Sequence, residues 1–579
     1  MSFQGWNENH VPRFQRHTHN LSVETHGQKE KETPEGLNSW YNLSMLKYIN
    51  YQENYTKFQA PRQLVLPMDY GMMIPDDEPV RLLDAVLEEL DYTELLHLYS
   101  SKGRKSAVAP TILFKIIVMA MMDGIYSLRG IQHQCRVNIQ YMWLLQGHQA
   151  PSHMAFGRFI QRVPVSVWEN LFAQFIDVLS HIDSLSFDHI FVDGTKLEAQ
   201  ANRYTFVWRK NVERALVAAN QRQDMLRQQV AAATEIDTTG MNDDELLSLL
   251  YKECRERHIP FVHGSGHRKE PLQRLFEACA ENRKKRLTNE THLAILGERN
   301  SYSKTDHDAT FMRMKEDHMR NGQLKPAYNL QLAVASEYVV GVGVFPNPTD
   351  TKTLIPFLRE MDRIHGRKFR QVVADAGYDS EENYAWLEQH GYESVIKPSQ
   401  YEARKKKSRK KYIGLAENMD YDENHDEYVC AKGRRLRFVY WTTQKSKTGY
   451  RRDTKVYECT HCDHCGKRRQ CQRNRTGCMP KRPKRIYVSP EYERLQQDNA
   501  ARFASEVGTQ LRMNRSIQSE GAFAVIKSDF SYKRVLRRGK MSVYKEILLI
   551  LFGFNLRKLH NRIQEKRIGK ELFDVKKAV

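Results

Sequence analysis

Between residues 76 and 163, apolar side chains recur every three to four positions, which predicts a series of amphipathic helices. The first helix, in DDEPVRLLDAVLEELDYTELLHLYS, follows an acidic stretch with a proline, a common way for a helix to begin. The next stretch, PTILFKIIVMAMM, is apolar on every side, and Gly124 separates it from a further helix that begins near Ser127. The pattern therefore predicts a compact helical region with tight turns.

The helix after Ser127 carries a basic face. Arg129, His133 and Arg136 are spaced three and four residues apart, so they lie on one side of a helix. Compact helices with a basic face are typical of helix-turn-helix DNA-binding domains, in which Arg129 and Arg136 would contact DNA. An ordinary helical bundle with solvated arginines has the same pattern, and both interpretations stay open.

Further along the chain, two short apolar runs each lead to an aspartate and small residues. IFV precedes Asp193 and a glycine, and VVA precedes Asp375, an alanine and a glycine, so each run predicts a strand that ends at its acid. Residues 324–348 alternate on both sides of Ser336-Glu337, which predicts a hairpin. A helix, the strand before Asp375, a helix from Ser380 and the strand YESVI follow. Three strands, a helix, a strand, a helix and a strand is the order expected of an α/β ribonuclease H-like core.

These patterns divide the chain into several parts. We expect a loose leader at 1–60, an all-α, helix-turn-helix-like DNA-binding domain at 61–175, a catalytic core at 186–400 and 490–567, a helical insertion in that core at 211–300, and a basic, Cys-rich β insertion at 401–489. Met45 opens a segment that runs without a break into RQLVLPMDYGMMIP, which raises the hypothesis that translation starts there.

The charge balance narrows the class of partner. The 579 residues include 90 Lys and Arg against 70 Asp and Glu, a formal net charge of +20, which favours a polyanion such as nucleic acid. The longest apolar run, 547–554, is far shorter than the roughly 20 residues of a membrane span. The chain does not open with a charged and then apolar leader. We therefore expect a cytoplasmic protein that acts on nucleic acid and not on a membrane.

The cysteines predict a metal site. Nine cysteines, an odd number crowded mostly into one stretch, favour a reducing compartment over a disulfide framework. The segment CTHCDHCGKRRQC has the spacing of a tetrahedral structural Zn²⁺ site, with the ligands Cys459, Cys462, Cys465 and Cys471. Three cysteines at two-residue intervals also resemble iron–sulfur ligation, which stays open as a second interpretation. Cys430 and Cys478 are further candidates.

The acids at the strand ends predict a second kind of metal site. The strands before Asp193 and Asp375 are neighbours in the predicted core, so the two carboxylates meet at the edge where open α/β folds place their sites. Two-metal phosphoryl transfer needs two or three carboxylates around ions about 4 Å apart. A third acid, Glu520, is predicted on a late helix, after Arg515 and two turns before Lys527 on the same face. A solvated turn and an exposed ion-pair stripe are the alternatives.

Two features beside this site have ordinary explanations. Asp379 is predicted to cap the helix that contains SEENYAWLE. The basic run ARKKKSRKKY at 403–412 is either a mobile, solvated loop or a nonspecific phosphate-binding segment.

Four segments carry a resemblance to a known family: FVDGTKLEAQANRYTFVWRK, SYSKTDHDATFMRMKEDHMRNGQLKPAYNLQLAV, VVADAGYDSEENY and RSIQSEGAFAVIKSDFSYKRVLRRGK. The chain resembles the DDE transposases of bacterial insertion sequences, specifically insertion-sequence family 1182, which is related to the insertion-sequence 4 group. The resemblance covers nearly everything from about residue 45 to residue 567.

The resemblance implies a ribonuclease H-like catalytic domain whose acids are Asp193, Asp375 and Glu520. These acids would hold two Mg²⁺ (or Mn²⁺) ions, while Lys527 and Arg515 contact DNA phosphates. The related group has the signature Tyr-x2-Arg-x3-Glu-x6-Lys. Glu520 and Lys527 fit this signature, whereas Arg515 stands one position too early and a methionine replaces the tyrosine.

The implied activity is transposition. The enzyme would bind the terminal inverted repeats of its element as a homo-oligomer on double-stranded DNA, cleave a strand and join the freed 3′-hydroxyl to target DNA, in the bacterial cytoplasm at the nucleoid. One alternative is an inactive, transposase-derived DNA-binding regulator, which intact acids at all three positions argue against. Another is a nuclease that cuts DNA without joining strands, which the sequence does not separate from a transposase.

Overall fold

The computed structural model describes residues 69–99, 106–264, 269–314, 322–366, 369–472 and 482–570. All of them belong to one of the two units into which the chain divides, Asp69–Val579. The predicted leader at 1–60 and the start hypothesis at Met45 lie outside the described residues.

The amino-terminal part is helical, as its periodicity predicts. Its most apolar helix, α4, is buried all round apart from Thr111, because α19 and several neighbouring helices pack against it. Gly124, with a φ of +73°, makes the turn after α4, and Ser127 caps α5 by accepting a hydrogen bond from the Gly130 amide. The elements are η2 (Tyr70–Met73), α2 (Pro79–Glu88), α3 (Thr93–His97), α4 (Pro110–Met122), α5 (Leu128–Val137), α6 (Ile139–Leu144), α7 (His153–Arg162) and α8 (Val165–Asp183).

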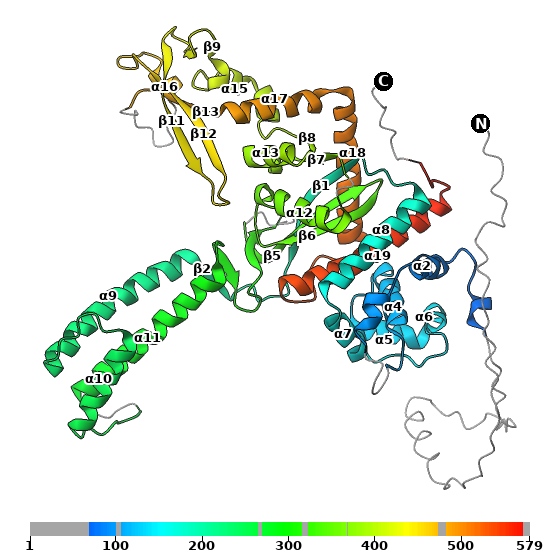
Figure 1. The fold of residues 1–579 in the computed structure, drawn as a ribbon, viewed down its shortest axis with the longest axis horizontal. Coiled ribbons are helices and arrows are strands. Elements are labelled where there is room, and N and C mark those ends of the chain that lie inside the picture. The colour runs from blue at the N-terminus through cyan, green and yellow to red at the C-terminus, as the bar shows by residue number, and fades with distance from the viewer. Residues whose placement is uncertain are drawn as a thin grey trace, which may run out of the picture. The chain divides into compact units, whose positions relative to one another are not determined.

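The unit Asp69–Val579 contains a mixed six-stranded sheet (Figure 1). Its strands lie in the order β4-β5-β1-β7-β8, and β6 also pairs with β5. β1, β7 and β8 are parallel, whereas β5 runs antiparallel to β1, β4 and β6. The strands are β1 (His189–Glu198), β4 (Thr310–Arg313), β5 (Leu324–Ala335), β6 (Tyr338–Phe345), β7 (Gln371–Ala374) and β8 (Glu393–Ile396). Helices α12 (Leu354–His365) and α13 (Glu381–Gln389) connect β6 to β7 and β7 to β8, as the predicted order has it, whereas β4 is a further strand that the sequence reasoning missed.

The hairpin predicted at Ser336-Glu337 is present, but its strands are buried on both faces. Both turn residues have positive φ, 47° and 72°, as a tight hairpin turn requires. Every residue of β6 is buried, because α19 and α12 both pack against this strand. Alternation in the sequence predicts one solvated face, so here the tertiary packing overrides the pattern.

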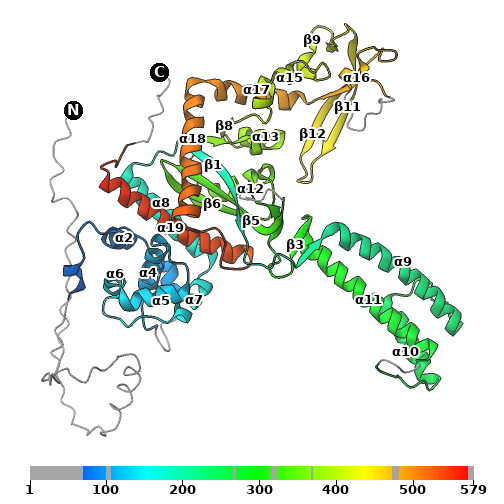
Figure 2. The same ribbon diagram turned by 180° about the vertical axis from the view of Figure 1, so that it is seen from behind.

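Helix α19 (Lys540–Gln564) joins the amino-terminal helices to the sheet (Figure 2). It packs against α4, α8 and β6. Near its end the buried Arg562 pairs with Asp183 of α8 at 2.6 Å and with Glu337 of the hairpin turn at 2.7 Å. Removing one partner of a buried ion pair costs about 3–5 kcal/mol, so these contacts hold the three elements together. The helices and the sheet consequently share one hydrophobic core.

The described part of the predicted helical insertion at 211–300 forms three helices. α9 (Arg209–Thr234), α10 (Asp243–Glu256) and α11 (Pro271–Leu296) follow β2 (Phe206–Trp208), which pairs with β3 (Ser301–Ser303). A cluster that includes Leu226, Leu250 and Cys279 gives these helices a core of their own. The chain thus leaves the sheet region after β1 and returns to it at β4.

The stretch after β8 forms a second sheet. The basic run at 403–412 overlaps the short helices α14 (Tyr401–Lys405) and α15 (Lys407–Lys410). Five strands follow, in the order β13-β12-β11-β10-β9, with α16 (Arg468–Cys471) after β12. They are β9 (Asp420–Asp422), β10 (Glu427–Val429), β11 (Arg435–Lys445), β12 (Arg451–Cys459) and β13 (Arg485–Val488).

Two helices lead from this second sheet back to the core. α17 (Pro490–Ala504) packs against β8 and α13, and α18 (Glu506–Ala524) packs against β1, β5 and β7. The chain continues from α18 into a π-helical segment, η6 (Val525–Asp529). No described helix has the length and apolar character that a membrane span requires.

Candidate active site

Asp193 lies within β1 and not at its end, which corrects the sequence prediction. The strand continues to Glu198 because β5 pairs with it as far as that residue. Asp193 stands opposite Leu332 of β5, one position past the last pair that β1 makes with β7. Its Oδ1 accepts a hydrogen bond of 2.7 Å from the amide of Gly194. The acid therefore sits where one neighbouring strand stops and the other continues.

Asp375 lies directly after β7, as predicted. It is the N-cap of the short helix η4 (Ala376–Tyr378), and its Oδ1 accepts a hydrogen bond of 2.7 Å from the Gly377 amide. Val192 of β1 pairs with Ala374 of β7, so the two aspartates that follow these residues are neighbours across the parallel ladder. The structure thus brings Asp193 and Asp375 to the same place on the sheet.

A third carboxylate, which the sequence reasoning missed, lies beside this pair. Asp350 begins η3 (Asp350–Lys352), in the connection between β6 and α12. A Cβ atom on Gly194 would lie 2.7 Å from its Oδ1, and a Cβ atom on Gly377 would lie 3.4 Å from its Oδ2. Asp350 therefore adjoins the glycines that follow the two aspartates. The sequence signal for it is an acid shortly after the third strand, like Asp375 after the fourth.

Side-chain amides hold Asp350 in place. Its Oδ1 accepts hydrogen bonds from Asn329 Nδ2 at 2.7 Å and Gln331 Nε2 at 3.0 Å, and both donors come from β5. The hydroxyl of Tyr378 donates to Gln331 Oε1. Burial, followed by the charges of Asp350, Asp193 and Asp375, raises the pKa of Tyr378 far above its ordinary value. The tyrosine is therefore a neutral donor beneath a cluster of negative charge.

Arg515 of α18 reaches this cluster. Its Nη1 lies 3.3 Å from Oδ2 of Asp193, and both side chains are largely buried. The sequence predicts Arg515 as a phosphate contact, and in the structure its cation lies against a carboxylate of the candidate site. The guanidinium of Arg515 therefore offsets part of the negative charge of the carboxylates.

Glu520 lies on α18 with an exposed side chain. The helix packs against β1, β5 and β7, so Glu520 comes from the element that covers the strands of the two aspartates. The predicted same-face relation between Glu520 and Lys527 rests on α-helical spacing. Lys527 lies in the π-helical segment η6, so the last part of the step from Glu520 does not follow α-helical spacing. The shared face of Glu520 and Lys527 stays a prediction.

The prediction that Asp379 caps α13 is wrong. Ser380 is the N-cap, and its hydroxyl accepts from the Asn383 amide. Asp379 instead accepts hydrogen bonds from the Tyr492 hydroxyl at 3.0 Å and the Ser399 amide at 2.6 Å. These bonds tie the loop after η4 to α17, a contact that local sequence does not reveal.

The two arginines of the predicted DNA-binding face, Arg129 and Arg136, are exposed on α5. The apolar side of this helix, with Ile131 and Cys135, is buried in the shared core. The basic side is thereby left to solvent, in agreement with the periodicity of the sequence.

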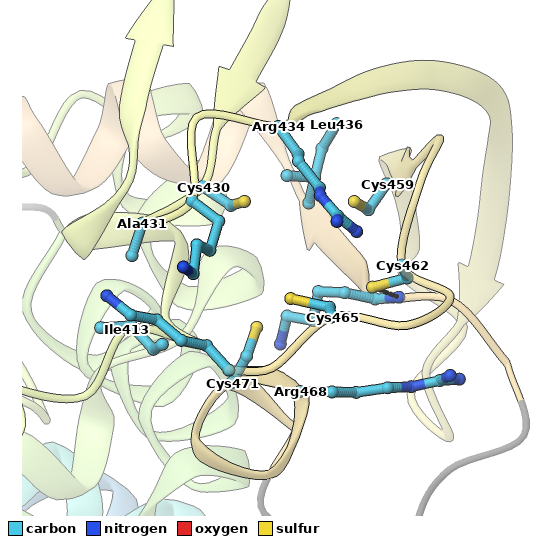
Figure 3. A pocket seen from close by; sticks show the side chains of 13 residues that line it. Ile413, Cys430, Ala431, Arg434, Leu436, Cys459, Cys462, Cys465, Arg468 and Cys471 are labelled. Atoms are coloured by element: carbon cyan, nitrogen blue, oxygen red, sulfur yellow. Dashed lines mark hydrogen bonds between the residues drawn. The ribbon is translucent and has the colours of Figure 1, made fainter.

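The Cys-rich segment gathers five sulfur atoms around one cavity (Figure 3). Cys459 ends β12, the next two cysteines lie on the turn that follows, and Cys471 ends α16. Cys430, from the turn between β10 and β11, lines the same cavity, although it is distant in sequence. Burial raises the pKa of Cys459 to about 11, and the neighbouring thiols of Cys462 and Cys430 add to the rise. Cys478 lies outside the described residues.

One acidic group also has the spacing of a metal site. Ligand atoms of Asp422, His425 and Glu427 lie within 4.8 Å of one another, the only such group of three among the described residues. Its charge is already compensated, because Arg435 pairs with both carboxylates and Arg437 Nε lies 3.4 Å from Glu427. A group whose acids are paired with guanidinium ions has little charge left for a cation.

Comparisons with known proteins identify two segments. Residues 429–560 match a family model described as a transposase DDE domain, and residues 68–162 match one described as a transposase domain (DUF772). Glu520, Lys527 and the five cysteines lie within these matches, whereas Asp193 and Asp375 lie outside them. Neither the curated proteins nor the solved structures contain a match to the chain.

The two matches support a DDE transposase of the insertion-sequence type. A transposase DDE domain implies a ribonuclease H-like core and a metal-dependent enzyme that cuts and joins DNA. The mixed sheet described above, with parallel β1, β7 and β8, agrees with that core.

The glycine after Asp193 provides a test of how tightly the site is packed. A Cβ atom on Gly194 would lie 2.4 Å from Gln331 Nε2, so Gly194→Ala must displace the side chains that hold Asp350. We expect Gly194→Ala to destabilise the fold by about 1–3 kcal/mol through overpacking. The measurement is the midpoint of urea or thermal unfolding of the purified chain.

Gly521→Ala on α18 is the matched control, because its Cβ atom would meet nothing within 4 Å. We expect this change to leave stability unchanged or to raise it by about 0.5–1 kcal/mol, since alanine favours helices. Equal unfolding midpoints for the two variants would contradict the crowding of Gly194.

Proposed function

We propose that this protein is a transposase that binds the terminal inverted repeats of an insertion sequence and catalyses strand cleavage and strand transfer. The observation that carries the proposal is the parallel ladder that sets Asp193 beside Asp375, in a chain with a transposase DDE domain match. The finer assignment, insertion-sequence family 1182, rests on the four quoted segments of the sequence. The proposal includes a homo-oligomer on double-stranded DNA at the nucleoid of the bacterial cytoplasm.

The residues of the site suit divalent cations with hard oxygen ligands. Asp193 and Asp375 would each supply a carboxylate, and Glu520 from α18 would complete the set. Two bound Mg²⁺ (or Mn²⁺) ions would activate the attacking oxygen and stabilise the leaving oxygen of an in-line displacement at phosphorus. Gly194 and Gly377 keep side chains away from the carboxylates, and their amides each fix one carboxylate oxygen.

The cations of the chain would position DNA. Arg515 neutralises Asp193 in the structure, and it becomes available to a phosphate when Asp193 binds a cation. Lys527, on the π-helical segment after α18, is the second proposed phosphate contact. Arg129 and Arg136, exposed on α5, would contact the inverted repeat, since basic helices of such compact domains dock on DNA.

Two acids compete for the role of third ligand. Glu520 is favoured by the signature of the sequence and by its helix, which covers the site. Asp350 is favoured by its position beside Gly194 and Gly377 and by its two amide donors. We assign ligation to Glu520 and positioning of the site to Asp350, because its Oδ1 is already committed to the amides of Asn329 and Gln331.

The first experiment uses DNA that carries the element's own ends, with Mg²⁺, and scores cleavage and strand joining separately. Asp375→Asn should slow both steps by about 10²–10³-fold, the usual cost of one electrostatic group in an active site. Asp224→Asn, which changes an exposed carboxylate on α9, is the control and should keep the wild-type rate.

Each outcome separates the proposed function from its alternatives. Cleavage without joining would identify a nuclease, and binding of the ends without either reaction would identify an inactive regulator. Wild-type rates for Asp375→Asn would show that Asp375 takes no part in catalysis. The comparisons support a transposase and do not favour either alternative.

A second pair of variants distinguishes the roles of Glu520 and Asp350. Glu520→Gln should slow cleavage by about 10²–10³-fold, because it removes a ligand from the reacting metal site. Asp350→Asn should slow it by about 10–100-fold, the usual effect of losing a residue that supports a metal ligand. The measurement is the cleavage rate as a function of Mg²⁺ concentration. A wild-type rate for Glu520→Gln with an inactive Asp350→Asn would reverse the two assignments.

The basic face of α5 predicts the salt dependence of binding. The double variant Arg129→Ala, Arg136→Ala should weaken binding to the inverted repeat and reduce the slope of log K against log salt concentration by about 1 for each phosphate that it no longer neutralises. Fluorescence anisotropy with a labelled end fragment measures this slope. Arg222→Ala, an exposed arginine on α9, is the matched control. If the double variant and the Arg222→Ala control both keep the wild-type slope, the α5 arginines do not contact the inverted repeat.

A further inference from the structure

The Cys-lined cavity is built from four separate pieces of the chain (Figure 3). Cys430 comes from the β10–β11 turn, Cys459 from the end of β12, Cys462 and Cys465 from the following turn, and Cys471 from the end of α16. The spacing within CTHCDHCGKRRQC points to the last four of these residues alone. Cys430 enters the cluster because β10 and β11 pair beside β12, so its place is a consequence of the sheet.

Cys430 and Cys462 come from different segments and line the same cavity as Cys459 and Cys471. The charges of Cys462 and Cys430 both contribute to raising the pKa of Cys459, at the end of β12, and of Cys471, at the end of α16, after the larger effect of burial. Sγ of Cys462 also accepts a hydrogen bond of 3.3 Å from the amide of Lys484. A hydrogen bond of this kind fixes the position of a sulfur ligand beside the cavity.

Cations surround the cluster. The cavity is lined by five basic residues, Lys432, Arg434, Lys467, Arg468 and Lys484. Four thiolates around one divalent ion carry a net charge of about −2. Lysines and arginines that line the same cavity stabilise this negative charge. The acidic group at Asp422, His425 and Glu427 lacks this advantage, since its carboxylates are already paired with Arg435 and Arg437. The electrostatics therefore favour a metal at the cysteines.

The sheet that holds the cluster has a small core. Its buried hydrophobic cluster consists of Met419, Tyr428, Leu436, Tyr457, Cys459, Cys462, Ile486 and Val488. β11 is exposed along most of its length. Small cores of this kind usually need a disulfide or a metal for stability, and the described cysteines are all free thiols. Two members of the core are themselves candidate ligands, so a metal here would reinforce the packing directly.

We propose that this cluster binds one structural Zn²⁺ through four thiolates and that Cys430 and Cys462 are two of the four. Zinc–sulfur bonds of about 2.3 Å in a tetrahedron place the sulfur atoms about 3.8 Å apart. Among the described residues, no three of these sulfur atoms lie within 4.8 Å of one another. The ion therefore draws the β10–β11 turn, the end of β12 and α16 together and clamps the second sheet at one end.

The test measures metal content and metal affinity of the full chain. Mass spectrometry of the purified protein should find about one zinc per chain, and Co²⁺ in its place should give the absorption of tetrahedral thiolate coordination. Cys430→Ala and Cys462→Ala should each weaken Zn²⁺ affinity by more than about 100-fold, beyond the usual loss of a supporting residue. Cys254→Ala, a buried cysteine of α10, is the matched control and should keep its zinc.

A second readout does not depend on the folding of any variant. Removal of zinc from the wild-type chain with a chelator should expose Cys430 to alkylation and speed hydrogen exchange across β10–β12, while β7 and α19 keep their protection. Wild-type zinc affinity of Cys430→Ala, or protection of Cys478 in place of Cys430, would overturn the ligand assignment. Iron with acid-labile sulfide, or a chain that binds no metal, would overturn the zinc site itself.

Discussion

The parallel pairing of β1 with β7 is the constraint on which the candidate active site depends. It places Val192 beside Ala374, and the next residue of each chain segment is an aspartate. β5 on one side and β8 on the other lock both strands into the sheet. A register shift of one residue would turn the side chains of β1 to opposite faces of the sheet. The two carboxylates are neighbours because the hydrophobic burial of both strands permits one register.

The site concentrates negative charge in a chain whose net charge is strongly positive. Asp193, Asp350 and Asp375 lie near one another, and their repulsion is offset by Arg515 of α18, by amides of β5 and by backbone N–H groups. We propose that this cluster binds divalent cations, because its donors are already held in place by hydrogen bonds. The surrounding excess of lysine and arginine suits a polyanionic substrate.

The two inserted segments are stabilised in different ways. The helices at 209–296 pack around their own aliphatic cluster. The second sheet buries few residues and brings five thiols to one cavity, so its stability is proposed to come from a metal. The amino-terminal helices differ from both insertions, because α19 and the Arg562 ion pairs include them in the core of the main sheet. The amino-terminal helices therefore share the core of the main sheet, whereas each inserted segment has a hydrophobic cluster of its own.

The sequence by itself determined the class of elements, their order and the candidates for chemistry. Apolar periodicity located the amino-terminal helices, and strand-like runs located Asp193 and Asp375, because local spacing reflects local burial. Tertiary structure decided the rest: the length of β1 is set by β5, the role of Asp379 by Tyr492 of α17, and the place of Lys527 by a π-helical turn. Asp350 joins its cluster through the amides of β5, and Cys430 joins the other cysteines because β10 and β11 pair beside β12. Contacts between residues far apart in the chain leave no periodic trace in the sequence, so only the folded chain reveals them.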